Sequence, residues 1–228
     1  MILKTQKIRA ITAHYFDLFV NSPFQRQHIN LLEQEIIGSC ETLLDIGCGD
    51  GAHIMGCAPH LKKSIGIDIF PPAIARARER GLYSQTILMN ADKISGCFEE
   101  HSFDCVLAFD LLEHLKKSDG LSLLSAMEKI ASKKVIVFTP NGFLPQSTIN
   151  GNVHQIHRSG WTTSEMQTRG YRVCGVHGIK GILGEESLPR WRPTRLWKLV
   201  TVLIQPFFLN IPRLAFQIFC VKTIMAPR

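Results

Sequence analysis

The chain has 228 residues, of which 45% are hydrophobic and 20% are charged, a balance that is typical of one globular domain and excludes a disordered or fibrous chain. The formal net charge is +7, but the basic residues form no platform interleaved with aromatic residues, so we expect no nucleic-acid partner. The seven cysteines show no C-x-x-C spacing and no signal-peptide core precedes Asp17, so we expect reduced thiols in a cytoplasmic protein.

Strands that alternate with helices are the main pattern along the chain. Residues 14–37 predict one or two helices, broken near Pro23, before the first strand. No helix pattern of ordinary length is recognised between the last two strands. The alternation predicts a parallel sheet that is covered on both faces. Strands are expected over 42–46, 64–68, 84–89, 103–109, 135–139, 171–176 and 215–222, and helices over 51–61, 71–80, 118–131 and 162–169, with a short helical piece over 111–116.

The most informative stretch is LLDIGCGDG, which begins at Leu43 and reads as a buried strand that ends in a glycine-rich turn. Its glycines let the backbone approach a ligand, and the helix start beyond the turn presents free N–H groups. Asp68 ends the next apolar strand. These features predict a pocket for a nucleoside-bearing cofactor, and a dinucleotide is one candidate, because Gly47, Gly49 and Ala52 fit G-x-G-x-x-A with Asp68 at about the ~20-residue offset.

Asp45 favours a different cofactor, because a carboxylate two residues before the first glycine attracts an amino group and repels a pyrophosphate. The ordered motifs LLDIGCGDG, IGIDIF and FDCVLAFDLLEHL resemble the class I S-adenosylmethionine-dependent methyltransferases of the small-molecule type. The resemblance runs from about Leu43 to Phe143, with weaker echoes to Lys222. It implies a doubly wound α/β fold with a seven-stranded, mostly parallel sheet of strand order 3-2-1-4-5-7-6, an antiparallel last strand, and helices on both faces. We expect an N-terminal helical cap over 1–40 and a methyltransferase domain over 41–228, with a hydrophobic and basic insertion at about 178–212 that is too long for a simple hairpin between the last strands.

The resemblance implies S-adenosyl-L-methionine as the cofactor. Asp45 would accept a hydrogen bond from its amino group, directly or through water, or it is an ordinary strand-end residue. Gly47, Cys48 and Gly49 would offer backbone to the methionine moiety. Asp68 would bind both ribose hydroxyls through charge-assisted hydrogen bonds.

The adenine and the methionine side have their own expected residues. By resemblance, Ile69 packs on the adenine, Asp92 accepts from its exocyclic amine and Ala91 donates from its backbone. Asp92 fits a loop or N-cap role equally well. Phe109 is expected to line the methionine side of the pocket.

Asp110, Glu113 and His114 leave the fourth strand at its carboxyl end, and their spacing would place them on one helical face. Three interpretations stay open. His114 is a general base, the three side chains bind a divalent metal as in the ubiquinone-pathway O-methyltransferases with their E-x-x-E-H run, or Glu113 and His114 are structural. We take His114 and Glu113 as the catalytic candidates and assign no metal ligand.

Two later segments bear on the acceptor. The long loop over 141–160 contains His154 and His157, and His157 and Trp161 are expected either to line an acceptor pocket or to pack the following helix. Tyr15 and Phe16 are a candidate lid or plain core residues. The segment 190–212 combines basic residues and tryptophans with an apolar run broken by Pro206. It suits protein packing or a homodimer contact, a lid over an apolar substrate, or a helix in a membrane interface.

The expected activity is methyl transfer to a small-molecule acceptor such as a lipid, quinone or sugar, at an oxygen nucleophile. Two other function classes stay open, a nicotinamide-dependent oxidoreductase and a noncatalytic S-adenosylmethionine-binding module. The segment from Phe109 to Leu112 has no Asn-Pro-Pro-Tyr type motif, which argues against methylation of amino groups in nucleobases or glutamine.

Overall fold

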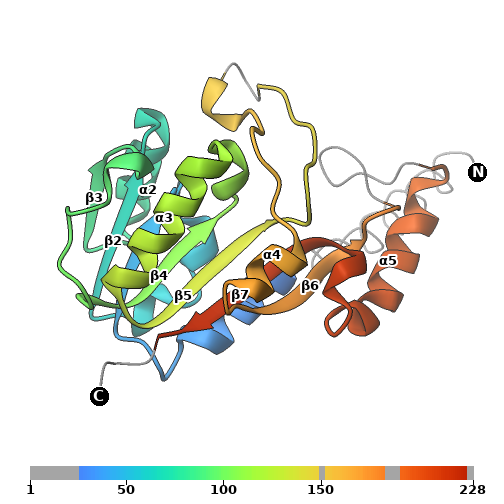
Figure 1. Ribbon diagram of the computed structural model, residues 1–228, viewed down its shortest axis with the longest axis horizontal. Helices are drawn as coiled ribbons and strands as arrows, with labels where there is room; N and C mark the ends of the chain where they lie inside the picture. The colour runs from blue at the N-terminus through green and yellow to red at the C-terminus, as the bar shows by residue number, and fades with distance from the viewer. Residues whose placement is uncertain (1–25, 149–151, 183–190, 225–228) are drawn as a thin grey trace, which may run out of the picture.

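The computed structural model describes residues 26–148, 152–182 and 191–224, and it contains a seven-stranded sheet of order β3-β2-β1-β4-β5-β7-β6 (Figure 1). β7 is antiparallel to β5 and β6, and the other pairs are parallel. The predicted strand order and direction are confirmed. The strands are β1 Thr42–Ile46, β2 Lys63–Asp68, β3 Gln85–Leu88, β4 Phe103–Phe109, β5 Ala131–Pro140, β6 Arg172–Ile179 and β7 Ala215–Thr223, and the labelled helices are α2 Pro71–Arg80, α3 Lys117–Ile130, α4 Thr163–Thr168 and α5 Thr194–Phe208.

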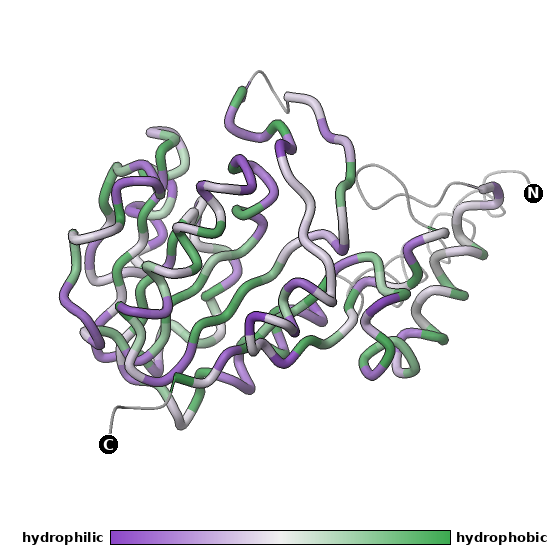
Figure 2. Tube along the Cα trace, viewed as in Figure 1, coloured by the Kyte–Doolittle hydropathy of each residue, from purple (hydrophilic) through white to green (hydrophobic). Residues whose placement is uncertain are grey.

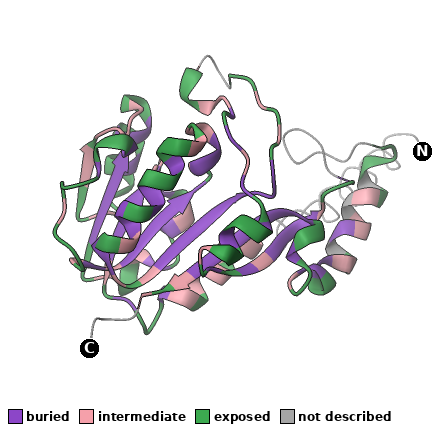
Figure 3. Ribbon diagram, in the orientation of Figure 1, coloured by how far each residue is buried: buried purple, intermediate pink, exposed green. Residues whose placement is uncertain are grey.

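Helices cover both faces of the sheet, so most strands are buried while the helices expose their outer sides (Figure 3). Successive residues of a strand point to opposite faces. Leu44 therefore joins the core beneath α3 and α4, whereas Leu43 joins the opposite core with Leu32 and Ile36 of the helix over 26–36. The fold thus brings the carboxyl ends of the parallel strands to one edge, where loops are free to form a site.

The helix expected over residues 51–61 is not formed as one element. Two short 3₁₀ turns, Ala52–Ile54 and Ala58–His60, stand in its place. Pro59 lacks the N–H that a continuous α-helix would need at this point. Gly56 lies so close to the helix over 26–36 that an added Cβ would meet the Glu33 carboxylate at 1.7 Å. Close packing against that helix therefore replaces regular helical hydrogen bonding here.

A second difference lies between β6 and β7, where we expected no helix of ordinary length. The structure has the 15-residue helix α5, which projects beside β6 at the edge of the sheet (Figure 1). Gln205 anchors it, since its amide nitrogen donates to the Gly175 carbonyl at 3.2 Å and its oxygen accepts from the Gly178 N–H at 2.5 Å. Hydrophobic residues recur along most of α5 (Figure 2), but the helix contains Pro206, a residue that ordinarily ends a helix, so the sequence did not indicate one continuous element.

Candidate active site

A cavity of about 1110 Å³ lies at the carboxyl ends of the first four strands. Its wall is formed by the turn over 47–50 after β1, by 67–70 at the end of β2, by 89–92 after β3 and by 109–111 after β4, with part of the loop over 152–158. Nine of the eleven predicted site residues line it, whereas Asp45 and Glu113 do not. The nine are Gly47, Cys48, Gly49, Asp68, Ile69, Ala91, Asp92, Phe109 and His114.

The glycine-rich turn is closed against β2 by its own backbone. The N–H groups of Gly47 and Cys48 both donate to the Ile67 carbonyl, at 2.8 and 2.9 Å. Gly47 has a φ of 74°, and an added Cβ would come within 3.0 Å of the Leu111 side chain. Only glycine suits this conformation and this close approach. Burial raises the pKa of the Cys48 thiol, which therefore stays protonated and unreactive.

Asp68 and the turn form one hydrogen-bonded unit. One carboxylate oxygen accepts from the Gly49 N–H at 2.9 Å, and the other accepts from the Phe70 N–H at 2.8 Å. Each oxygen can accept a second hydrogen bond. The half-buried carboxylate is therefore held in place on the cavity wall with capacity left for two ligand hydroxyls.

Asp45 lies beneath the turn rather than on the cavity wall. It is fully buried, and one of its oxygens accepts from His53 Nε2 at 2.8 Å and from the Tyr83 hydroxyl. Its other oxygen is buried without a partner. His53 lines the cavity, so the first protein group between Asp45 and a bound ligand is an imidazole.

His53 is a site residue that the sequence reasoning missed. Burial disfavours its imidazolium, but the Asp45 carboxylate outweighs burial and raises the pKa of His53. Its ring stacks on Phe109 with centroids 5.1 Å apart. A histidine after a glycine turn carries no signal of this role, because the pairing with Asp45 appears only in the fold.

Asp110 is also placed differently from expectation. It has a φ of 45°, an uncommon conformation in which aspartate is enriched, and its carboxylate accepts from Gln217 Nε2 at 3.3 Å. The following helical piece is only the 3₁₀ turn Leu112–His114. The shared helical face expected for Asp110, Glu113 and His114 is therefore absent.

A chain of hydrogen bonds connects Asp110 to His28 on the opposite wall. Gln217 Oε1 accepts from His177 Nδ1, and His177 Nε2 pairs with His28 Nδ1 at 3.1 Å. His28 lines the cavity and stacks on Phe138 with centroids 4.6 Å apart. Burial and the neighbouring His177 lower the pKa of His28 to about 3, so His28 is neutral at physiological pH.

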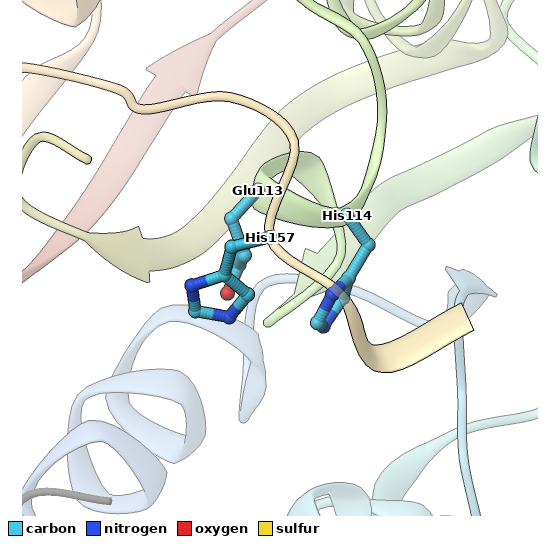
Figure 4. A group of neighbouring side chains, drawn as sticks. All are labelled: Glu113, His114 and His157. Carbon is cyan, nitrogen blue, oxygen red and sulfur yellow. The ribbon is translucent and has the colours of Figure 1, made fainter. Parts of the chain in front are cut away.

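Glu113 and His114 instead meet His157, which the loop over 141–160 contributes (Figure 4). One ligand atom from each residue lies within 4.8 Å of the others. Glu113 is buried and accepts from the Thr139 hydroxyl at 2.9 Å. His114 Nδ1 donates to the Ile156 carbonyl at 3.3 Å, and His157 Nδ1 donates to the Leu144 carbonyl at 2.6 Å. In the neutral form, both imidazoles therefore keep the lone pair on Nε2.

The charges of this cluster follow from burial. Burial and the nearby His157 lower the pKa of His114 to about 4, and burial lowers the pKa of His157. Burial, followed by repulsion from Asp110, raises the pKa of Glu113 well above its ordinary value. Two neutral imidazoles and one buried carboxyl group fit the donor set of a divalent transition metal. This set differs from the D-x-x-E-H interpretation, since His157 takes the place of Asp110.

The loop that carries His157 is bound across the 3₁₀ turn. The N–H groups of Arg158 and Ser159 both donate to the Glu113 carbonyl, at 2.7 and 3.1 Å. His154 and Arg158 line the cavity, but His157 and Trp161 do not. Trp161 is buried and packs against Gly120 of α3. Of the two expected roles, packing therefore describes its place better than lining an acceptor pocket. Tyr15 and Phe16 lie outside the described residues.

Comparison with known proteins identifies the central part of the chain. Residues 44–139, which span β1 to the end of β5, match the family model described as methyltransferase domain. Nodulation protein S of Sinorhizobium fredii is 27% identical over 128 residues, which cover 56% of this chain and 56% of that protein. The match therefore spans about half the length of this curated relative.

Solved structures share the fold at low sequence identity. An S-adenosylmethionine-dependent methyltransferase from Archaeoglobus fulgidus has a TM-score of 0.55 and 18% identity, and the match covers 92% of this chain and 99% of that one. The N-methyltransferase NodS from Bradyrhizobium japonicum, in complex with S-adenosyl-L-homocysteine, has a TM-score of 0.56 and 17% identity, with 90% and 89% covered. These similarities show the fold of a class I methyltransferase over nearly the whole chain.

Proposed function

We propose that this chain, whose residues 44–139 match the family model described as methyltransferase domain, is a class I S-adenosylmethionine-dependent methyltransferase that transfers a methyl group to the oxygen of a small-molecule acceptor in the cytoplasm. One observation carries the proposal. A single cavity is lined by the Gly47–Gly49 turn, by the Asp68 carboxylate and by His114. A cofactor site and a group able to take a proton therefore face the same space.

The cofactor in this proposal lies along the strand ends. Asp68 binds the ribose hydroxyls, Ile69 packs on the adenine, and Asp92 with the Ala91 backbone recognises the adenine edge. The methionine end lies over the glycine turn beside Phe109. Asp45, which lies beneath the glycine turn, attracts the amino group of the cofactor through His53 or through water. A dinucleotide suits this site less well, since the carboxylates of Asp50 and Asp68 line the cavity at the glycine turn and would repel a pyrophosphate.

In methyl transfer the protein does not need to activate the methyl group, because the sulfonium of the cofactor already does so. The protein holds the nucleophile in line with the methyl–sulfur bond, and proximity supplies much of the rate. A hydroxyl acceptor also needs a proton acceptor. We assign that role to His114 Nε2, with Glu113 fixed beside it by Thr139. Nitrogen is the alternative acceptor, because the structural relative NodS is named an N-methyltransferase.

A divalent cation is a second way for the same cluster to act. Glu113, His114 and His157 would hold it, and it would lower the pKa of a coordinated hydroxyl. Chelation separates the two roles. If His114 acts alone, turnover survives treatment with a chelator, whereas a loss that Mn²⁺ restores assigns the cluster to a metal.

Calorimetry and methyl-transfer assays test the function itself. We expect S-adenosylmethionine to bind the purified chain and NAD not to bind. We expect radiolabelled methyl transfer to at least one acceptor in a panel of lipids, quinones and sugars. Binding of NAD in place of S-adenosylmethionine would overturn the proposal, and cofactor binding with no turnover on any acceptor would favour a noncatalytic binding module.

A further inference from the structure

The positive charge of the chain is concentrated at its C-terminal end. From Ser187 to Arg228 the sequence contains seven Lys and Arg residues and no Asp or Glu. This equals the formal net charge of +7 for the whole chain, so the remaining residues are balanced. α5 lies inside this basic segment. Two of these residues, Arg192 and Arg213, are exposed just before and after α5 in the chain, whereas Lys222 lies on β7 and pairs with Glu128.

α5 presents an apolar face to solvent. Leu196, Leu203 and Phe207 are 51%, 63% and 70% exposed. Their spacing of seven and four residues places them on one side of the helix. Large apolar residues at both ends of the helix extend this face, namely Trp191, Ile211 and Leu214.

The opposite face of α5 is fixed to the domain. Trp197 and Ile204 pack in a small cluster with Ile182 and Phe216. Thr201 and Gln205 are buried on the same side. The helix is therefore not free to turn its exposed leucines and phenylalanine inward, and the apolar face is a stable property of the folded surface.

The dimensions of α5 decide how it can meet a bilayer. A 15-residue helix is about 22 Å long at 1.5 Å per residue, shorter than a hydrocarbon core of ~30 Å. Among the residues that the structure describes, no helix has the length and apolar character to cross a membrane. A helix with one apolar face, flanking arginines and an exposed tryptophan just before its start suits the plane of the interface. That residue is Trp191, which is 50% exposed and contacts Trp197 of the inner face with ring centroids 5.1 Å apart.

We propose that the outward face of α5, formed by Leu196, Leu203 and Phe207, docks the protein on anionic phospholipid membranes. The exposed Arg192 and Arg213 flank this face and would pair with lipid phosphates. A second copy of the chain is a poorer occupant, because a symmetric contact would bring two strongly basic segments together. The proposal does not depend on the methyl acceptor, since it concerns binding alone.

Vesicle co-sedimentation of the full chain tests the docking. We expect binding to phosphatidylcholine vesicles that contain phosphatidylserine, little binding without it, and release at high salt. Leu203→Glu and Phe207→Glu are each expected to lower the partition coefficient by about tenfold or more. Leu121→Glu is the matched control, since Leu121 is a 43% exposed apolar residue on α3, and it should bind as the unmodified chain does. Thermal melting of each variant checks that it is folded.

Three results would contradict membrane docking. The first is no binding to anionic vesicles at low salt. The second is equal binding by the α5 variants and the Leu121→Glu control. The third is a stable dimer, seen by light scattering, that the α5 substitutions dissociate and that does not bind vesicles, since a second copy would then cover the face.

Discussion

Asp68 is positioned by backbone donors before any ligand binds. Its two oxygens accept from Gly49 and Phe70, so the side chain would lose little further freedom on accepting hydrogen bonds from a ligand. The sequence predicts Asp68 because an apolar run that ends in an acidic residue can be recognised locally. It does not predict His53, nor that His157 meets Glu113, because these contacts form only in the fold. Local motifs therefore predicted the residues of the cavity wall better than the contacts beneath and beside it.

The first prediction concerns the substitution Asp68→Asn. An amide cannot accept on both sides, so its NH₂ group would face a backbone N–H of Gly49 or Phe70. The charge that strengthens hydrogen bonds to ribose is lost as well. We expect the Kd for S-adenosylhomocysteine to rise by about tenfold to a hundredfold, measured by calorimetry. Glu79→Gln is the control, because Glu79 is exposed on α2 and does not line the cavity, and an equal loss there would contradict the special role of Asp68.

The second prediction follows from the lowered pKa of His114. The folded protein holds this imidazole neutral down to a pKa of about 4, whereas the unfolded chain binds the proton near 6.5. The stabilising contribution of neutral His114 is therefore complete above pH 6.5 and is lost as the pH falls toward 4. Over this pH range, we expect the free energy of unfolding to fall by about 1–3 kcal/mol less in His114→Gln than in the unmodified protein. Urea titrations at several pH values measure it, and parallel curves for both proteins would rule out the buried neutral state.

At the scale of elements, regular alternation made the sheet predictable. β1, β4 and α2 have the predicted bounds, because each has a clear apolar pattern with a sharp end: Gly47 follows β1, Ser102 and Asp110 border β4, and α2 lies between Pro71 and Gly81. The expected helix over 51–61 is replaced by two 3₁₀ turns, and Pro59 lacks the N–H that a continuous α-helix needs there. α5 was missed as a regular element because Pro206 lies inside it, so its apolar run was interpreted as broken.

The third prediction tests packing between α3 and the loop that ends at Trp161. A Cβ added at Gly120 would lie 2.5 Å from the indole ring. Alanine in a helix is favoured over glycine by up to about 1 kcal/mol, but this clash should outweigh the preference. We expect Gly120→Ala to lower the free energy of unfolding by about 1–3 kcal/mol in urea titrations. Gly181→Ala has open space around it and serves as the control. A stabilised Gly120→Ala protein would show that the indole moves aside freely.

At the scale of the whole molecule, the site depends on segments far apart in the chain. The cavity wall includes His28 of the N-terminal helix, the turns after four strands, and the loop that carries His154. The sequence predicts the strand-end part of this wall, because parallel strands bring their carboxyl ends together. It does not predict which loop residues close the cavity, because loop conformation depends on tertiary contacts such as the bonds from Arg158 and Ser159 to Glu113. A ligand in the cavity would thus contact segments that only the folded chain brings together.

The last prediction uses this linkage between binding and stability. S-adenosylhomocysteine at about 100 times its Kd should add about 2.7 kcal/mol to the free energy of unfolding, because it binds the folded chain alone. For a domain of this size, 1 kcal/mol raises the Tm by about 2–4 °C, so a shift of roughly 5–10 °C is expected in a melting curve. NAD at the same concentration should leave the Tm unchanged, and Asp68→Asn should need more S-adenosylhomocysteine for the same shift. A shift of equal size with NAD would mean that the glycine turn binds a pyrophosphate, against the electrostatics of Asp45 and Asp68.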